Sequence, residues 1–182
     1  MNTTSLKNLF FFTFSFVLFL GFTACEETTI EDDGLVNANN WTERQIEIPT
    51  SDSLVAGSTY LSTYSQIYSR SEHTTHDLTV TVSMRNVSRT DSLYITAADY
   101  FDTHGELIRT YLKKPIYLIP METVEIVINE VDKAGGTGAN FIFDWHAKPD
   151  TEKPHFEAVM ISTYGQQGLS FVTHGYDIRA TR

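Results

Sequence analysis

Apolar and polar residues alternate along several short segments of the chain, and this alternation constrains the fold more than any other feature. The clearest runs are Leu78–Met84 and Phe141–Trp145, in which every second residue is apolar. A period of two is typical of β-strands that bury one face and expose the other. No apolar pattern with the helical period extends beyond about one turn. The sequence therefore predicts an all-β domain.

Further strands are predicted between turn residues, and together they favour one architecture. These strands lie at Leu93–Ala98, Glu106–Lys113, Val124–Ile128, Val159–Ile161 and Leu169–Thr173. Asp102–Gly105 has the composition of a hairpin turn, in which Gly105 supplies a positive φ. Short strands separated by such turns indicate a single antiparallel β-sandwich over residues 59–182, immunoglobulin-like but without a disulfide; a closed barrel is the alternative. We expect Trp145 to be buried between the two sheets.

The first 24 residues differ in composition from the rest of the chain. Lys7 is their only charged residue, and an apolar run of 12 residues follows it at Leu9–Leu20. As a helix this run would span roughly 18 Å, whereas the hydrocarbon core of a bilayer is about 30 Å thick. It therefore suits the core of a signal peptide better than a transmembrane helix.

The apolar run ends in Gly21–Cys25, which resembles the lipobox of bacterial lipoproteins. There, small residues precede a cysteine whose thiolate takes a diacylglyceryl group. Thr23 and Ala24 are small, and Cys25 is the only cysteine in the chain. We predict a lipoprotein signal peptide at 1–24 and lipidation of Cys25, with ordinary secretion after cleavage at Ala24 as the alternative. Two or more acyl chains would anchor the protein stably to a membrane of the bacterial envelope, the outer membrane or cell surface.

The residues after Cys25 are strongly acidic. Glu26, Glu27, Glu31, Asp32 and Asp33 follow it before any basic residue. Like charges at this density repel each other and extend the chain, so we predict a disordered acidic tether over 25–58. Such residues also resemble a signal for export to the cell surface in some diderm bacteria; an ordinary solvated linker is equally open.

The net charge of the chain limits the kinds of partner that it is expected to bind. The chain carries 23 Asp and Glu against 13 Lys and Arg, a formal net charge of −10. Nucleic acid is therefore not expected as a partner, because phosphate binding needs clustered Lys and Arg.

Five separated motifs resemble, in this order, an uncharacterised bacterial lipoprotein family called domain of unknown function three-one-two-four. They are Tyr64–Tyr68, Leu78–Asn86, Asp99–Gly105, Gly135–Phe141, and Glu157–Ile161 leading to Gly165–Phe171. The resemblance covers about residues 60–175. It is specific for the family and fits bacterial export, but it implies no activity and no site residues.

Candidate binding residues come from loops and aromatic side chains. Gln166 and Gln167 join two predicted strands and can each donate and accept hydrogen bonds. Asn140 ends a glycine-rich segment and is a further candidate. Tyr94 and Tyr100, on one face of a predicted strand, could form an aromatic platform, although cross-strand packing is the commoner role of such tyrosines. We expect a non-enzymatic module that binds a protein or glycan.

Two alternatives remain from other functional classes. Asp144 and His146 share a strand face, and Ser170 and His174 lie near the C-terminus, so an envelope hydrolase could use some of these residues. No nucleophile-elbow motif is present, and we assign no catalytic residue. The other alternative is a structural assembly subunit.

No metal site and no cofactor is expected from the sequence. His73 and His76, with Glu72 beside them, are the nearest approach to a ligand set. Zinc sites need three or four protein ligands, and residues three apart on a strand point to opposite faces.

The lipobox generates the first testable prediction. Cys25→Ser removes the thiol that accepts the diacylglyceryl group, so unprocessed precursor should accumulate and metabolic labelling with a radioactive fatty acid should disappear. Electrophoresis of labelled cells measures both. Cleavage after Ala24 with unchanged lipid labelling would contradict the lipoprotein interpretation.

Overall fold

The structure is a computed structural model that describes residues 41–50, 53–163 and 168–178. Within these ranges it contains β-strands and no helix, and hence no helical segment long and apolar enough to cross a membrane. The strands are β1 (Val55–Ser62), β2 (Gln66–Ser69), β3 (Ser71–Asp77), β4 (Thr79–Arg85), β5 (Leu93–Phe101), β6 (Leu107–Thr110), β7 (Ile116–Leu118), β8 (Thr123–Ile128), β9 (Asn140–Ala147), β10 (His155–Ser162), β11 (Leu169–His174) and β12 (Tyr176–Ile178). Cys25 and residues 1–24 lie outside the described residues.

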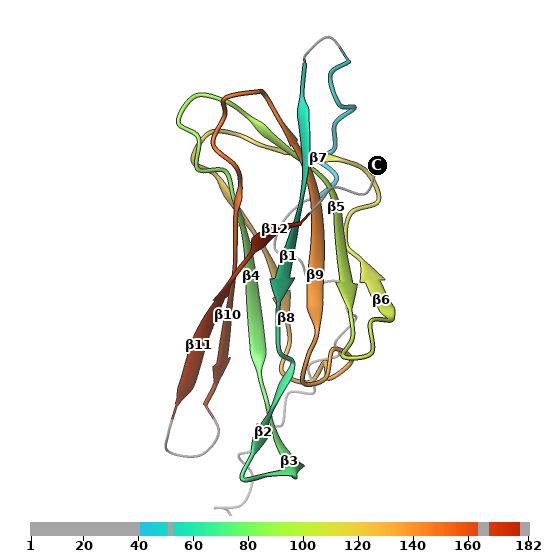
Figure 1. The fold of residues 1–182 in the computed structure, drawn as a ribbon, viewed down its shortest axis with the longest axis vertical. Helices are drawn as coiled ribbons and strands as arrows, with labels where there is room; N and C mark the ends of the chain where they lie inside the picture. Colours follow the sequence, from blue (N-terminus) through green and yellow to red (C-terminus); the bar gives the residue numbers. More distant parts are fainter. Residues whose placement is uncertain (1–40, 51–52, 164–167, 179–182) are drawn as a thin grey trace, which may run out of the picture. The chain divides into compact units, whose positions relative to one another are not determined.

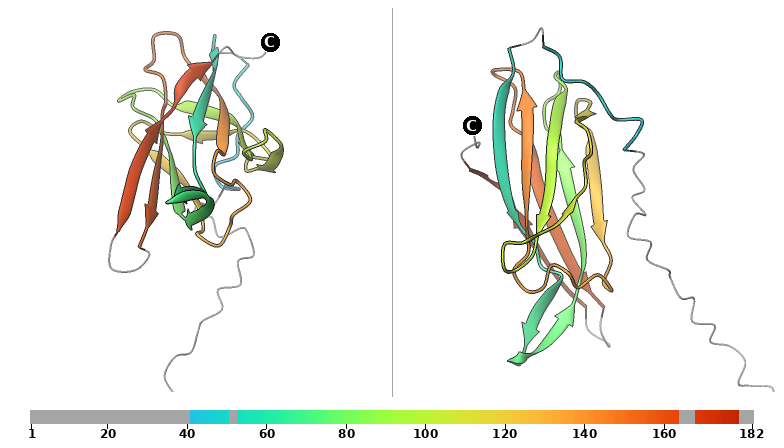
Figure 2. Two further views of the ribbon diagram at one scale, coloured as in Figure 1. Left: turned by 60° about the horizontal axis from the view of Figure 1, so that its bottom comes forward. Right: turned by 90° about the vertical axis from the view of Figure 1, so that its right-hand side faces the viewer.

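The strands form two facing antiparallel sheets and one separate hairpin (Figure 1). The larger sheet has the order β12-β1-β9-β5-β6, and β7 also pairs with β5; the smaller sheet has the order β11-β10-β4-β8. Figure 2 shows the two sheets as separate layers. The predicted all-β sandwich is therefore confirmed, and the closed barrel is not what forms.

The core between the sheets is built around aromatic residues of β9. Phe141, Phe143 and Trp145 point inward, and Trp145 is only 4% exposed, as predicted. The Phe143 ring lies 5.3 Å from that of Phe141 and 4.4 Å from that of Phe156, which β10 contributes from the opposite sheet. This stack ties the two layers together.

Trp145 fits its position because the neighbouring strand offers no side chain there. Gly57 on β1 is its Cα partner, and a Cβ atom built on Gly57 would lie 2.2 Å from the indole Cζ2. The indole Nε1 donates a hydrogen bond to Thr59 Oγ1 at 3.1 Å, which satisfies the buried donor. Glycine is thus required at residue 57, because the Trp145 indole lies too close to leave room for a Cβ atom there.

The last two strands join the sheets. β11 pairs with β10 in the smaller sheet, and β12 pairs with β1 in the larger one, so the chain changes sheets at Gly175. The Gly175 N–H donates to the Phe156 carbonyl at 2.9 Å. A Cβ atom there would lie 2.7 Å from the Thr59 side chain, so the crossing also needs glycine.

The predicted turn at Asp102–Gly105 is present. Gly105 has a φ of 82°, and the Asp102 carboxylate accepts hydrogen bonds from the His104 and Glu106 N–H groups at 2.8 and 2.9 Å. These backbone donors, that of Glu106 foremost, hold the pKa of Asp102 below its usual value. The turn connects β5 to β6 as expected.

The predicted aromatic platform of Tyr94 and Tyr100 does not form. The β5–β9 register shifts at Thr96, which adds one residue to β5 between the partners of Trp145 and Asp144. A one-residue insertion turns the following side chains to the other sheet face. Tyr94 therefore pairs with His146 on the outer face, whereas Tyr100 is fully buried, stacks on Phe141 at 4.7 Å and shares a 2.9 Å hydrogen bond with Ser65.

Ordered residues occur within the stretch predicted as a tether. Trp41 packs against the core, the Ile46 N–H donates to the Pro115 carbonyl, and the Tyr117 N–H donates to the Arg44 carbonyl. β1 also starts at Val55 rather than after residue 58. Residues 25–40 of the predicted tether lie outside the described residues.

The β2–β3 hairpin leaves the sandwich between β1 and β4 (Figure 1). Its base is held by Gln66, whose side chain donates to Asp77 at 2.7 Å, and by the 2.7 Å ion pair of Lys133 with Asp77. The local sequence pattern did not reveal this hairpin, because most of its side chains are exposed and show no apolar alternation.

Burial of Trp145 leads to a stability prediction. Trp145→Ala should lower the free energy of unfolding by about 3–5 kcal/mol, because it empties a large aromatic site and removes the partner of Thr59. Urea denaturation measures the change. Val87→Ala, at an exposed residue, is the control, and its free energy of unfolding should stay within about 0.5 kcal/mol of the wild-type value. A loss under about 1 kcal/mol for Trp145→Ala would contradict the packing described.

Burial of Tyr100 leads to a pH prediction. Desolvation raises the pKa of the Tyr100 phenol to about 12, whereas tyrosine in the unfolded chain titrates near 10. The stability that neutral Tyr100 contributes is thus complete below pH 10 and is lost between pH 10 and 12, because the unfolded state releases its proton first. The difference in free energy of unfolding between wild type and Tyr100→Phe, measured by urea denaturation, should therefore narrow by about 1 kcal/mol from pH 9 to 11.

A control for this experiment is Val87→Ala, at an exposed residue that carries no titratable group. Its free energy of unfolding should differ from that of wild type by the same amount at both pH values. If the difference in free energy of unfolding between wild type and Tyr100→Phe also stayed constant from pH 9 to 11, the pKa of Tyr100 would not be raised.

Candidate functional site

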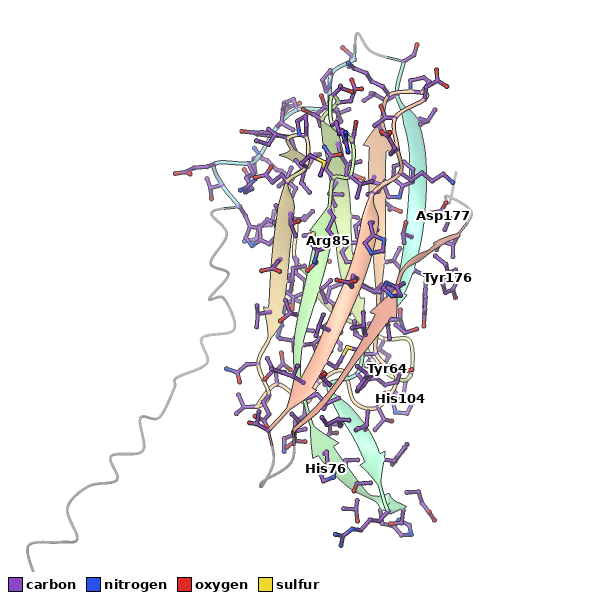
Figure 3. The ribbon with its side chains drawn as sticks, turned by 90° about the vertical axis from the view of Figure 1, so that its left-hand side faces the viewer. Tyr64, His76, Arg85, His104, Tyr176 and Asp177 are labelled. Carbon is purple, nitrogen blue, oxygen red and sulfur yellow. The ribbon has the colours of Figure 1, made fainter. Side chains whose placement is uncertain are left out.

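The outer face of the smaller sheet carries two adjacent polar rows, which the strand register brings together. Viewed across the strands, one row contains Glu125 of β8, Ser83 of β4, Glu157 of β10 and His174 of β11. The next row contains Thr123, Arg85 and His155. Figure 3 looks onto this face and labels Arg85 near its middle. We call these seven residues the polar band.

Three side chains of the polar band converge. His155 and Glu157 alternate on the same face of β10, and His174 is the Cα partner of Glu157 on β11. Glu157 Oε2 lies 3.8 Å from His155 Nε2 and 3.7 Å from His174 Nδ1. The imidazole centroids are 5.5 Å apart. These three residues are the only group of three or more possible metal ligands within the described ranges.

Arg85 organises the other side of Glu157. Its Nη2 lies 3.3 Å from Glu157 Oε1, and its Nη1 donates to Thr123 Oγ1 at 3.2 Å. Ser83 Oγ in turn donates to Glu125 Oε1 at 3.2 Å. One Glu157 oxygen is therefore held by Arg85, and the other faces the histidines.

A row of apolar residues lies beside the polar band on the same face. Val127 of β8, Thr81 of β4, Val159 of β10 and Val172 of β11 are successive cross-strand partners. Val127 and Val172 are 52% and 47% exposed, and Ile161, next to Val159 on this face, is also exposed. We call Val127, Val159 and Val172, together with Ile161 from the adjacent cross-strand row, the apolar row; Thr81 separates Val127 from Val159 within it. The exposed face of an antiparallel sheet is usually polar, so this row is unusual.

The other residues predicted for binding lie away from this face or outside the described residues. Tyr94 lies on the outer face of the larger sheet, and Asn140 begins β9 and is partly exposed. Gln166 and Gln167 fall in the connection between β10 and β11 but lie outside the described residues. The structure thus does not bring Tyr94 or Asn140 to the polar band.

The residues considered for a hydrolase are divided between the two sheets. Asp144 and His146 lie on β9 of the larger sheet, where Asp144 accepts a hydrogen bond from the Ser58 hydroxyl. Ser170 and His174 lie on β11 of the smaller sheet. Of the four, only His174 takes part in the converging group.

The sequence carries one local signal for the converging group, which lies just before the strand predicted from Val159. His155 and Glu157 are spaced by two, directly after Pro154, but the strand was predicted to begin at Val159. Extending the alternation back to His155 places both side chains on one face. His174 had no local signal, because its position opposite Glu157 depends on the β10–β11 register.

Comparison with known proteins identifies the family of the chain. A solved structure from Thermotoga maritima, titled "Crystal Structure of Thermotoga maritima 1070", is similar with a TM-score of 0.43 and 6% sequence identity, over 66% of this chain and 92% of that chain. No curated protein is significantly similar in sequence. The family described as "Protein of unknown function (DUF3124)" matches residues 56–178, which agrees with the predicted resemblance. The chain therefore belongs to this family.

Proposed function

We propose that the protein is a lipid-anchored module of the bacterial cell envelope whose β-sandwich binds a protein or glycan and is not an enzyme. The anchor would be the acylated Cys25, which would hold the domain at the outer membrane or cell surface. The binding surface would be the outer face of the smaller sheet. Gln166 and Gln167, which fall in the sequence between β10 and β11, would remain candidate binding residues.

The proximity of the apolar row to the polar band is the observation that carries this proposal. Val159 and Glu157 are neighbours on β10, as are Val172 and His174 on β11. An exposed surface on which apolar side chains lie beside charged and hydrogen-bonding groups has the composition of a recognition surface. Isolated exposed apolar residues need no explanation, but a row across the sheet favours contact with a ligand.

A hydrolase is less well supported. A Ser-His-Asp arrangement needs the nucleophile, the base and the orienting acid within hydrogen-bonding reach. Ser170 and Asp144 belong to different sheets. The outer face is also open, whereas catalytic sites are commonly concave.

Photocrosslinking in cells tests the binding face. A photoreactive phenylalanine analogue at Val127 or Val172 should give an adduct of the same size from both positions, since both side chains project from one surface. Leu107 on β6 of the larger sheet is a comparably exposed control and should give none. Electrophoresis and mass spectrometry of the adduct identify the ligand.

Charge substitution provides the second arm of this test. Val172→Lys should abolish the adduct from Val127 without changing the melting temperature, because residue 172 is outside the core. Adducts from Leu107 alone, or an adduct from Val127 that survives Val172→Lys, would contradict the proposed face.

A further inference from the structure

We propose that His155, Glu157 and His174 form a binding site for one divalent transition-metal ion of the zinc and copper class. This inference goes beyond the proposed function and depends neither on the lipid anchor nor on the apolar row. It depends on three ligand side chains that two neighbouring strands present on one face.

The separations between the ligand atoms fit a metal with small side-chain adjustments. Zinc binds histidine nitrogen and carboxylate oxygen at about 2.0–2.2 Å, so two ligands of a tetrahedral ion lie about 3.4 Å apart. The two distances from Glu157 Oε2 to the histidine nitrogens are 3.7 and 3.8 Å. All three ligand atoms lie within 4.8 Å of one another. Rotation of the partly exposed imidazoles about their side-chain torsions closes the remaining difference.

The backbone holds the ligands in place before a metal binds. Glu157 and His174 are paired across the β10–β11 ladder, and the inward-pointing Phe156 keeps His155 and Glu157 on the outer face. Sites on strands are held more firmly than sites on loops. Metal binding would therefore order the side chains of the histidines but would not need to order the backbone.

Arg85 serves as an outer partner of the site. It contacts Glu157 Oε1 and so leaves Oε2 facing the histidines, as outer hydrogen bonds commonly orient a carboxylate ligand. The guanidinium also binds Thr123 and lies within hydrogen-bond distance of Ser83, so its position is fixed from two sides. Glu125 lies in the same row, which gives the polar band two carboxylates against one guanidinium.

The donor set selects the class of metal. Two imidazoles and one carboxylate suit Zn²⁺ and Cu²⁺, whereas Ca²⁺ and Mg²⁺ prefer sites made entirely of oxygen ligands. The side chains of His155, Glu157 and His174 are 43%, 22% and 62% exposed. With three protein ligands on an open face, at least one coordination position would face solvent, where a donor group of a ligand could bind.

Isothermal titration calorimetry with ZnCl₂ and with CuCl₂ tests the proposal. The full-length chain is purified in detergent without a polyhistidine tag, and it carries Cys25→Ser so that the single thiol cannot bind the metal. We expect saturable binding of one ion per chain, tighter for Cu²⁺ than for Zn²⁺, and no binding of CaCl₂.

Single substitutions assign the ligands. His155→Gln and His174→Gln should each weaken Zn²⁺ binding by about tenfold or more. In a parallel titration with Co²⁺, each substitution should also remove the visible absorption of the bound ion. His104→Gln, in an exposed turn on the larger sheet, is the matched control and should bind as the parent does. Unchanged circular dichroism would show that the variants are folded.

Two outcomes would overturn the proposal. One is no saturable Zn²⁺ or Cu²⁺ binding by the folded parent chain. The other is binding that persists at parental affinity in both His155→Gln and His174→Gln, which would place the metal elsewhere.

Discussion

The packing of Phe143 against Phe156 joins the two sheets, and the orientation of the polar side chains on the surface of the smaller sheet depends on it. The rings are 4.4 Å apart, and the surrounding inward positions are fully buried. Because successive side chains of a strand point to opposite faces, burying Phe156 forces His155 and Glu157 outward. A slip of β10 by one residue would bury both and expose Phe156, at a large cost in buried apolar area and in unpaired charge. The hydrophobic core thus determines which polar side chains meet on the surface.

The features predicted correctly from sequence are those determined within one strand or one turn. The inward face of Phe141–Trp145 follows from its alternation, and the Asp102–Gly105 turn follows from a side-chain acceptor and a residue that tolerates positive φ. The all-β class needs no more than this. The Leu78–Met84 strand was predicted in the same way and agrees with β4.

Features that depend on pairing between distant segments were not predictable. The extra residue at Thr96 separates Tyr94 from Tyr100; the sequence marks it only by Asp99, which interrupts the apolar alternation of Leu93, Ile95 and Ala97. Likewise, nothing near His174 indicates that it faces Glu157, 17 residues earlier, because that neighbour is set by the β10–β11 register. Local periodicity gives the face of a strand, but bulges and register decide which side chains become neighbours.

The strand order has a consequence for how the domain folds. β1 pairs with β9 and β12, and β4 pairs with β10, so the first long strands find their partners only in the last third of the chain. Contacts between residues so far apart in sequence slow folding, because the loops between them must close first. During synthesis from the N-terminus, β1 therefore stays unpaired until β9 follows, and β4, which can pair with β8 on one edge, keeps the other edge unpaired until β10 follows. The step that completes β1 comes last, when the crossing at Gly175 delivers β12 from one sheet to the other.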